Sequence, residues 1–160
     1  MDHEKWINHT LELAKEAIVS GNPPFGALLE CNGEVILTHR STQITDNDCT
    51  AHAELNLARS AYSQLGMQKL ARMTLYTSTE PCAMCAGAIY WAGIRTVVFG
   101  CSLSRFAEVV GSSLDIDSRD IFRTANREIK VIGPILEEEV LQIHKDFWNE
   151  SLSTYLGKRH

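Results

Sequence analysis

Segments with the pattern of helices and segments with the pattern of strands alternate along the chain, and this alternation restricts the fold more than any other feature. Apolar side chains in residues 3–20 follow the spacing of an amphipathic helix, which the sequence G-N-P-P then ends. Two strand-like runs follow at residues 25–31 and 34–39, with Asn32 and Gly33 between them. Asn-Gly is typical of two-residue β-hairpin turns, so these runs predict an antiparallel pair.

The rest of the chain continues the alternation. Helices are expected at residues 51–64, 82–92 and 136–155, and strands at residues 73–78, 96–101 and 128–133. A loop with one short helix is expected between the last two strands. Strands that alternate with helices are typical of a layered α/β domain. We therefore predict α/β class, a three-layer α/β/α sandwich with a mixed five-stranded sheet, formed by a single domain over residues 1–160.

Composition and charge exclude several other classes of protein. No apolar run approaches the roughly 18–20 residues of a membrane span, so we expect no membrane association. The net charge of −5 argues against a large phosphate-binding surface. The N-terminus is charged and has no apolar signal-peptide region, and five cysteines are an odd number for a disulfide framework. We expect a cytoplasmic protein whose cysteines serve metal binding or catalysis.

Two short motifs at the starts of two predicted helices carry metal-binding chemistry. The first, H-A-E, contains His52 and Glu54, and the second, P-C-A-M-C, contains Cys82 and Cys85. Zn²⁺ prefers thiolates and neutral imidazole as ligands. A helix N-terminus lowers the pKa of a thiol placed there, which makes the thiolate available near neutral pH. The sequence therefore predicts a zinc site made by His52, Cys82 and Cys85.

Three protein ligands leave one tetrahedral position of the zinc open, which is typical of a catalytic rather than a structural site. Glu54 lies two residues from His52 and is the candidate general acid/base. A closed structural site is the alternative, because Cys49, three residues before His52, could supply a fourth ligand. Glu54 would then have no role.

Together the motifs read H-x-E and P-C-x-x-C, the pattern of zinc-dependent nucleobase deaminases. The chain resembles the cytidine deaminase-like superfamily in these motifs. The resemblance extends to P-F-G-A at residues 24–27 and to L-Y-T-S-T-E-P-C-A-M-C-A-G-A-I-Y-W-A at residues 75–92. The chain is most similar to the branch of guanine, cytosine and tRNA-adenosine deaminases. The resemblance covers nearly the whole chain. It implies a Zn²⁺-dependent hydrolytic deaminase that releases ammonia from a nucleobase or nucleoside.

The resemblance also orders the hypotheses about the substrate. The endings P-F-G-A and G-A-I-Y-W-A are most similar to guanine deaminases, so a guanine-type small molecule ranks first. A tRNA-specific adenosine deaminase is the second hypothesis, and tRNA is a partner only in that case. The third is a non-catalytic, zinc-stabilised interaction domain. The resemblance further implies a homodimer, and residues 91–94, W-A-G-I, leave an apolar surface for it.

Two departures from the family pattern leave the choice of base open. Ser41 stands where family members often have an Asn that contacts the base, and residues 110–115, V-G-S-S-L-D, replace an acidic loop. Phe147 and Trp148 fit either core packing or a lid over the pocket. The candidate substrate contacts are Phe25, Ser41, Ala53 and Ser78.

Overall fold

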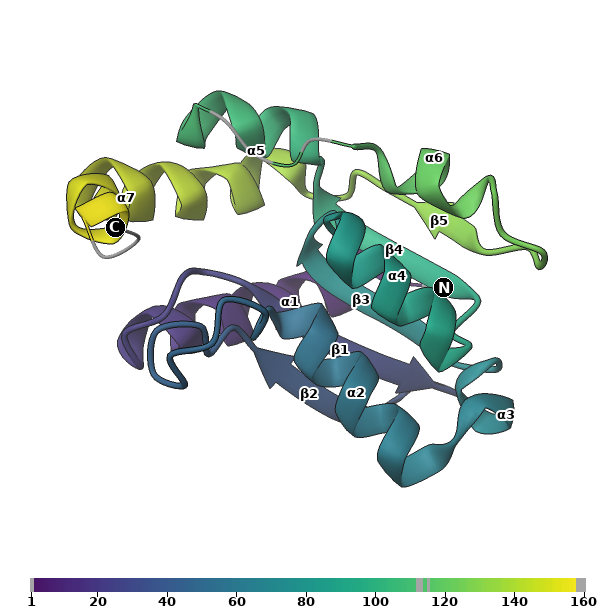
Figure 1. The fold of residues 1–160 in the computed structure, drawn as a ribbon. Coiled ribbons are helices and arrows are strands. Elements are labelled where there is room, and N and C mark those ends of the chain that lie inside the picture. The colour runs from purple at the N-terminus through teal and green to yellow at the C-terminus, as the bar shows by residue number, and fades with distance from the viewer. Residues whose placement is uncertain (1, 112–113, 115, 158–160) are drawn as a thin grey trace.

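A mixed five-stranded sheet forms the centre of the computed structural model, which describes residues 2–111, 114 and 116–157 (Figure 1). The strands are β1 (Gly26–Cys31), β2 (Glu34–Arg40), β3 (Thr74–Thr79), β4 (Thr96–Cys101) and β5 (Lys130–Ile132). They lie in the order β2-β1-β3-β4-β5. β1 pairs antiparallel with β2 and β3, whereas β3, β4 and β5 are parallel. The predicted mixed sheet is confirmed.

Helices cover both faces of this sheet. The described helices are α1 (His3–Val19), α2 (Ala53–Leu65), α3 (Met67–Leu70), α4 (Ala83–Ala92), α5 (Leu103–Val110), α6 (Ser118–Phe122) and α7 (Glu137–Gly157). α2, α4 and α6 contribute to the core on one face, and α1, α5 and α7 to the core on the other (Figure 1). The predicted three-layer α/β/α sandwich is confirmed. No described helix is long and apolar enough to cross a membrane.

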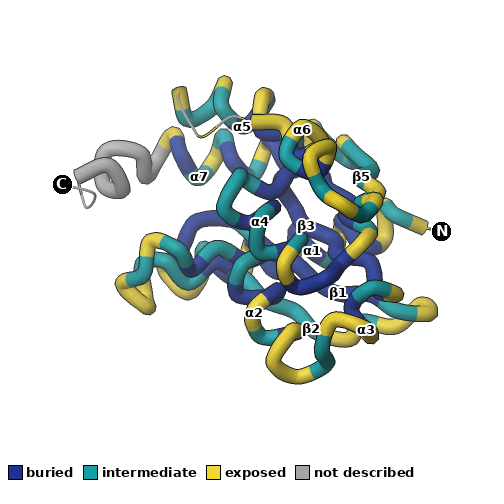
Figure 2. Tube along the Cα trace, turned by 45° about the vertical axis from the view of Figure 1, so that its right-hand side comes forward, coloured by how far each residue is buried: buried dark blue, intermediate teal, exposed yellow. Residues whose placement is uncertain are grey.

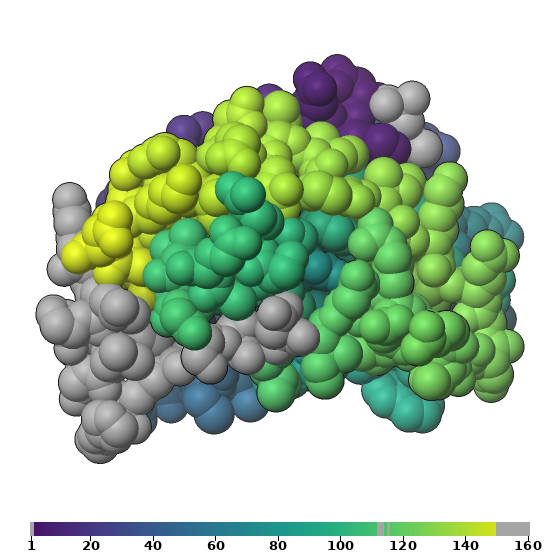
Figure 3. Space-filling model, turned by 90° about the horizontal axis from the view of Figure 1, so that it is seen from above, coloured from purple at the N-terminus to yellow at the C-terminus, as the bar shows by residue number. Residues whose placement is uncertain are grey.

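The expectation of a loop with one short helix between the last two strands is wrong, because both α5 and α6 form there. α5 begins at a cap, since the Ser102 side chain accepts a hydrogen bond from the Arg105 backbone N–H. Seen from above, α5 lies against α7 (Figure 3). Helices of eight and five residues are too short to show a clear apolar period, and tertiary contacts decide whether they form.

The first hairpin follows from local chemistry. Asn32 and Gly33 adopt positive φ angles of 53° and 82°, as a tight turn between two strands requires. Gly26 and Gly100 let the helices approach the sheet closely. A Cβ at Gly26 would lie 2.4 Å from the Thr10 carbonyl oxygen, and one at Gly100 would lie 2.6 Å from Val140 Cγ2. α1 and α7 therefore rest directly on the strands.

The alternation of side chains along β3 divides the core between the two faces. Leu75 packs with Leu57 and Ile89 on the side of α2 and α4. Tyr76, the next residue, packs with Ile7 and other side chains on the side of α1 and α7. Figure 2 shows the buried strands between outer helices whose solvent faces are exposed.

A buried histidine joins α7 to the end of β3. His144 is fully buried, its Nε2 lies 2.7 Å from Thr79 Oγ1, and Trp148 Nε1 donates to its Nδ1 over 3.3 Å. Because Nδ1 accepts from the indole, Nε2 carries the proton and donates to Thr79. Trp148 is itself buried and packs against Phe106, so it is a core residue rather than a lid.

The neutral state of His144 predicts a pH dependence of stability. Burial lowers the pKa of His144 from 6.5 to about 3. Below pH 6.5 the unfolded chain therefore gains a proton that the native protein does not bind, and stability falls as the pH decreases toward 3. We expect His144→Gln to remove up to about 1.4 kcal/mol per pH unit of this slope between pH 6 and 4. Urea unfolding at several pH values measures it, and parallel curves for the two proteins would contradict the assignment.

Candidate metal centre

Three side chains of the ligand type meet where α2 and α4 begin. His52 and Cys82 are the residues immediately before α2 and α4, and Cys85 lies in the first turn of α4. His52 Nδ1 lies 3.7 Å from Cys82 Sγ and 3.6 Å from Cys85 Sγ. All three atoms lie within 4.8 Å of one another. The structure thus brings together the three residues that the sequence predicts as ligands.

The spacing of these atoms fits a zinc ion. Tetrahedral zinc with bonds of about 2.3 Å to sulfur and about 2.0–2.1 Å to nitrogen holds such atoms about 3.6 Å apart. Both observed nitrogen–sulfur distances agree with this value. Cys49 is exposed and does not belong to the cluster, so the closed four-ligand alternative finds no support. The described residues provide three ligands and leave one tetrahedral position open.

The electrostatics of the two thiols differ strongly. The hydrogen bond with Cys85, helped by His52, lowers the pKa of Cys82 to about 4. The same bond and burial raise the pKa of Cys85 well above its usual range. Cys82 is therefore a ready thiolate, whereas Cys85 holds its proton. A metal that binds both sulfurs must release that proton.

Glu54 lies beside the cluster without belonging to it. It is the second residue of α2, is only 4% exposed, and its Oε1 accepts a hydrogen bond of 2.9 Å from Thr77 Oγ1. Burial raises the pKa of Glu54, and the nearby His52 opposes this change. A carboxyl group with a raised pKa next to a metal cluster is suited to accepting and returning protons near neutral pH.

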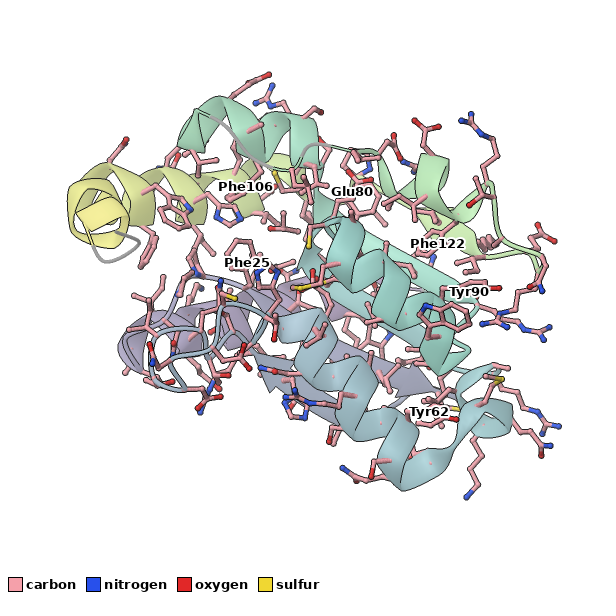
Figure 4. The ribbon with its side chains drawn as sticks, in the orientation of Figure 1. Phe25, Tyr62, Glu80, Tyr90, Phe106 and Phe122 are labelled. Atoms are coloured by element: carbon pink, nitrogen blue, oxygen red, sulfur yellow. The ribbon has the colours of Figure 1, made fainter. Side chains whose placement is uncertain are left out.

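Among the candidate substrate contacts, Phe25 packs against other aromatic rings. Its ring lies edge-on to Phe106 with centroids 5.6 Å apart, and 5.2 Å from the ring of His144. Figure 4 shows Phe25 and Phe106 pointing toward each other from opposite sides. Phe25 contributes to the cores on both faces of the sheet, so its position is fixed by packing.

The other three candidates are buried. Ser41 lies next to Phe25, since its backbone N–H donates to the Phe25 carbonyl, and its hydroxyl donates to Gln43 Oε1 over 3.0 Å. Ala53 is the first residue of α2 and adjoins the cluster. The Ser78 hydroxyl accepts from a backbone N–H of β1 over 3.2 Å, so it already joins two strands. Their contacts with a substrate stay predictions.

Glu80, to which the sequence motifs assign no role, joins three elements near the site. Glu80 is buried, and its carboxylate accepts from the Leu103 N–H and from the N–H and hydroxyl of Ser118 at 2.7–3.0 Å. It thereby ties the starts of α5 and α6 to the turn that leads to Cys82 (Figure 4). An acidic residue directly before P-C is the only local signal of this role.

The loop at residues 110–115, where the family has an acidic loop, is described only in part. The residues outside the described ranges are Ser112, Ser113 and Asp115.

The cluster predicts a defined metal content. The purified protein should carry about one zinc ion per chain, and Cys82→Ala should lose it because two ligands hold zinc poorly. Cys31→Ala is the matched control, since Cys31 lies on β1 outside the cluster. Elemental analysis after gel filtration measures both. Full zinc content in Cys82→Ala would contradict the ligand assignment.

Comparison with known proteins agrees with this geometry. Residues 1–101 match the family model described as the cytidine and deoxycytidylate deaminase zinc-binding region. The chain is 35% identical over 149 residues to the protein named "Probable cytosine deaminase" of Schizosaccharomyces pombe, covering 90% of this chain and 91% of that protein. It is 32% identical over 147 residues to the tRNA-specific adenosine deaminase of Bacillus subtilis, covering 92% and 89%.

A solved structure extends the similarity to three dimensions. The X-ray structure of guanine deaminase from Bacillus subtilis is similar with a TM-score of 0.62 and 32% identity, over 93% of this chain and 95% of that one. These relatives are thus named for three different bases. The chain belongs to the cytidine deaminase-like family of zinc-dependent deaminases.

Proposed function

We propose that the protein hydrolytically deaminates an amino-substituted heterocycle, with a guanine-type base or nucleoside as the first substrate to test. The observation that carries the proposal is the buried carboxyl of Glu54 beside a cluster that offers only three ligands. A structural zinc site needs neither an open position nor an adjacent acid. Family membership supports the reaction class.

The residues of this chain fit the proton transfers of such a reaction. A zinc ion bound at the cluster lowers the pKa of water and so supplies a nucleophile near neutral pH. Glu54 takes a proton from the water that adds to the amine-bearing ring carbon and passes it to the neighbouring ring nitrogen. It then moves the remaining hydroxyl proton to the amine, which leaves as ammonia. The ring carbon ends as a carbonyl.

Two observations favour a small flat substrate. Phe25 and Phe106 offer ring faces and edges against which a heterocycle can pack. The net charge of −5 does not favour a polyanionic substrate. The motif P-F-G-A at residues 24–27 ranks guanine-type substrates first. Ser41 offers a single hydroxyl in place of an amide, and this hydroxyl already donates to Gln43, so a different exocyclic pattern on the base stays open.

The second hypothesis is deamination of adenosine in tRNA. The tRNA-specific adenosine deaminase of Bacillus subtilis is 32% identical to this chain, the same identity as in the structural comparison with the guanine deaminase of that organism, so these two comparisons support both hypotheses equally. The third hypothesis, a zinc-stabilised interaction domain, leaves the buried Glu54 without a role. We further propose a reducing, cytosolic location, because all five cysteines are free and both sulfur ligands must stay reduced.

Ammonia release from a panel of substrates tests the proposal. The zinc-loaded protein is incubated with guanine, guanosine, cytosine, adenine, a pterin and a tRNA anticodon stem-loop. We expect turnover of at least one free base or nucleoside. Glu54→Gln should keep the zinc and the fold but lower turnover by about 10²–10⁴-fold, as is typical of a lost general acid/base.

The other outcomes separate the hypotheses. Reaction of the stem-loop only would replace the small-molecule proposal by the tRNA alternative. A zinc-loaded protein that deaminates nothing in the panel would favour the interaction domain. Near-normal turnover by Glu54→Gln would assign the proton transfers to another group.

We also propose that the protein forms a homodimer through the outer faces of α2 and α4. Tyr62 of α2 and Trp91 of α4 are 50% and 72% exposed, and Met67 of the adjoining α3 is 41% exposed. They line a mainly apolar groove of about 550 Å³ together with Leu55, Ala58, Arg59, Ala88 and Ala92. Apolar patches of this kind mark interfaces, and a second copy can cover such a patch with its own equivalent. The two helices that begin at the cluster would then also carry the interface.

Sedimentation at micromolar concentration should show a species of twice the mass of the 17.9-kDa chain. Trp91→Glu should shift it to the monomer, because a buried charge opposes association. Val19→Glu is the control, since Val19 is 89% exposed on α1, away from the groove. A monomeric wild-type protein would exclude this interface.

A further inference from the structure

We infer that Thr77 is a positioning residue that fixes one oxygen of Glu54 and leaves the other for proton transfer, a role that rests on the proposed deaminase function. Thr77 is fully buried on β3. Its Oγ1 lies 2.9 Å from Glu54 Oε1 and 3.0 Å from the Thr79 carbonyl oxygen. The hydroxyl thus lies between the candidate acid/base and the end of the strand that leads to the metal ligands.

The backbone of Thr77 is fixed from both sides. β3 is a central strand, in which Thr77 is aligned with Ala27 of β1 and with Phe99 of β4. Thr is also β-branched, which restricts rotation of its hydroxyl about χ1. A hydroxyl on such a rigid strand orients its partner better than one on a loop would.

The hydrogen bond from Thr77 gives the two carboxyl oxygens of Glu54 different roles. Oε1 accepts a hydrogen bond from Thr77, and the backbone N–H of Glu54 itself also interacts with the carboxyl. Glu54 is only 4% exposed, so bulk water does not compete for Oε1. With Oε1 held, rotation of the carboxyl is restricted, and Oε2 is the oxygen available to the reacting atoms.

The Thr79 carbonyl is a second acceptor for the Thr77 hydroxyl and preserves the contact between Thr77 and Glu54 during the reaction. A hydroxyl has one proton to donate and lone pairs to accept with. When the carboxyl is ionised, Thr77 donates to Oε1. When Oε2 carries the transferred proton, Oε1 still accepts from Thr77, and the Thr79 carbonyl, 3.0 Å away, is the alternative acceptor for the hydroxyl proton. The heavy atoms keep their places in both arrangements, so Glu54 does not need to be repositioned between proton transfers.

Steady-state kinetics of Thr77→Val, on whichever substrate the wild-type protein deaminates, tests this role. Valine keeps the shape of threonine and removes the hydroxyl. We expect the zinc content to be unchanged, KM to change less than about twofold, and kcat to fall roughly 10–100-fold, the range expected for a misplaced catalytic group. Thr77→Ser should recover most of kcat because it restores the hydroxyl.

Two controls separate positioning from general damage to the core. Thr10→Val removes another fully buried hydroxyl, which donates to the Ile7 carbonyl within α1, and should leave kcat unchanged. In a Glu54→Gln background, Thr77→Val should lower kcat much less than in the wild type, because it acts through the carboxylate. Thr77→Ala replaces the valine variant if that protein does not fold.

Crystal structures give a readout that does not depend on activity. The Glu54 carboxyl should occupy a single orientation in the wild type and more than one in Thr77→Val. If the wild-type protein deaminates none of the panel, the proposed function fails while this comparison still tests the hold on Glu54. A Thr77→Val protein with wild-type kcat, an equal loss of kcat in both backgrounds, or an unchanged Glu54 orientation would overturn the inference.

Discussion

The packing of α2 against α4 on one face of the sheet is the constraint on which the site depends. Both helices begin at the same edge of the core, so His52 Nδ1 comes to within 3.6–3.7 Å of Cys82 Sγ and Cys85 Sγ. A shift of either helix by one residue would move a ligand atom by about 1.5 Å along its axis. Such a shift would exceed the tolerance of a zinc–ligand bond. The packed core between the two helices therefore determines the distances between the ligand atoms of the metal centre.

β3 connects this metal centre to the rest of the molecule. Three residues near its end make long-range contacts: Thr77 with Glu54, Thr79 with the buried His144, and Glu80 with the starts of α5 and α6. One short segment of the strand thus contacts Glu54, the C-terminal helix α7 and the two helices α5 and α6. Because β3 lies between β1 and β4, these contacts share one rigid support.

The sequence predicted most of the fold and the three residues of the metal cluster because their signals are local. Apolar periodicity and the Asn32-Gly33 turn predict the elements. The spacing within C-x-x-C places two candidate ligands on one helical turn, and H-x-E places the third beside Glu54. The roles of Thr77 and Glu80 escaped sequence reasoning, since their partners lie 23–38 residues away. Of the two short helices α5 and α6, only one was expected, because capping and tertiary contacts rather than periodicity stabilise them.

The general chemistry of the zinc site and the specificity for a base depend on different features of the protein. Relatives of this chain carry cytosine, adenosine and guanine in their names, so membership of the family does not by itself determine the base. Selection must come from side chains around the ring. We propose that Ser41, which donates to Gln43, and Phe25, which packs against Phe106, contact the ring in this chain.

The coordination shell of the bound metal tests the central claim most directly. X-ray absorption at the zinc edge should show two sulfur ligands, one imidazole nitrogen and one light atom that the protein does not supply. Cys49→Ser should leave this spectrum unchanged, because Cys49 lies outside the cluster. A shell with three sulfurs that loses one in Cys49→Ser would show a closed structural site and contradict the account.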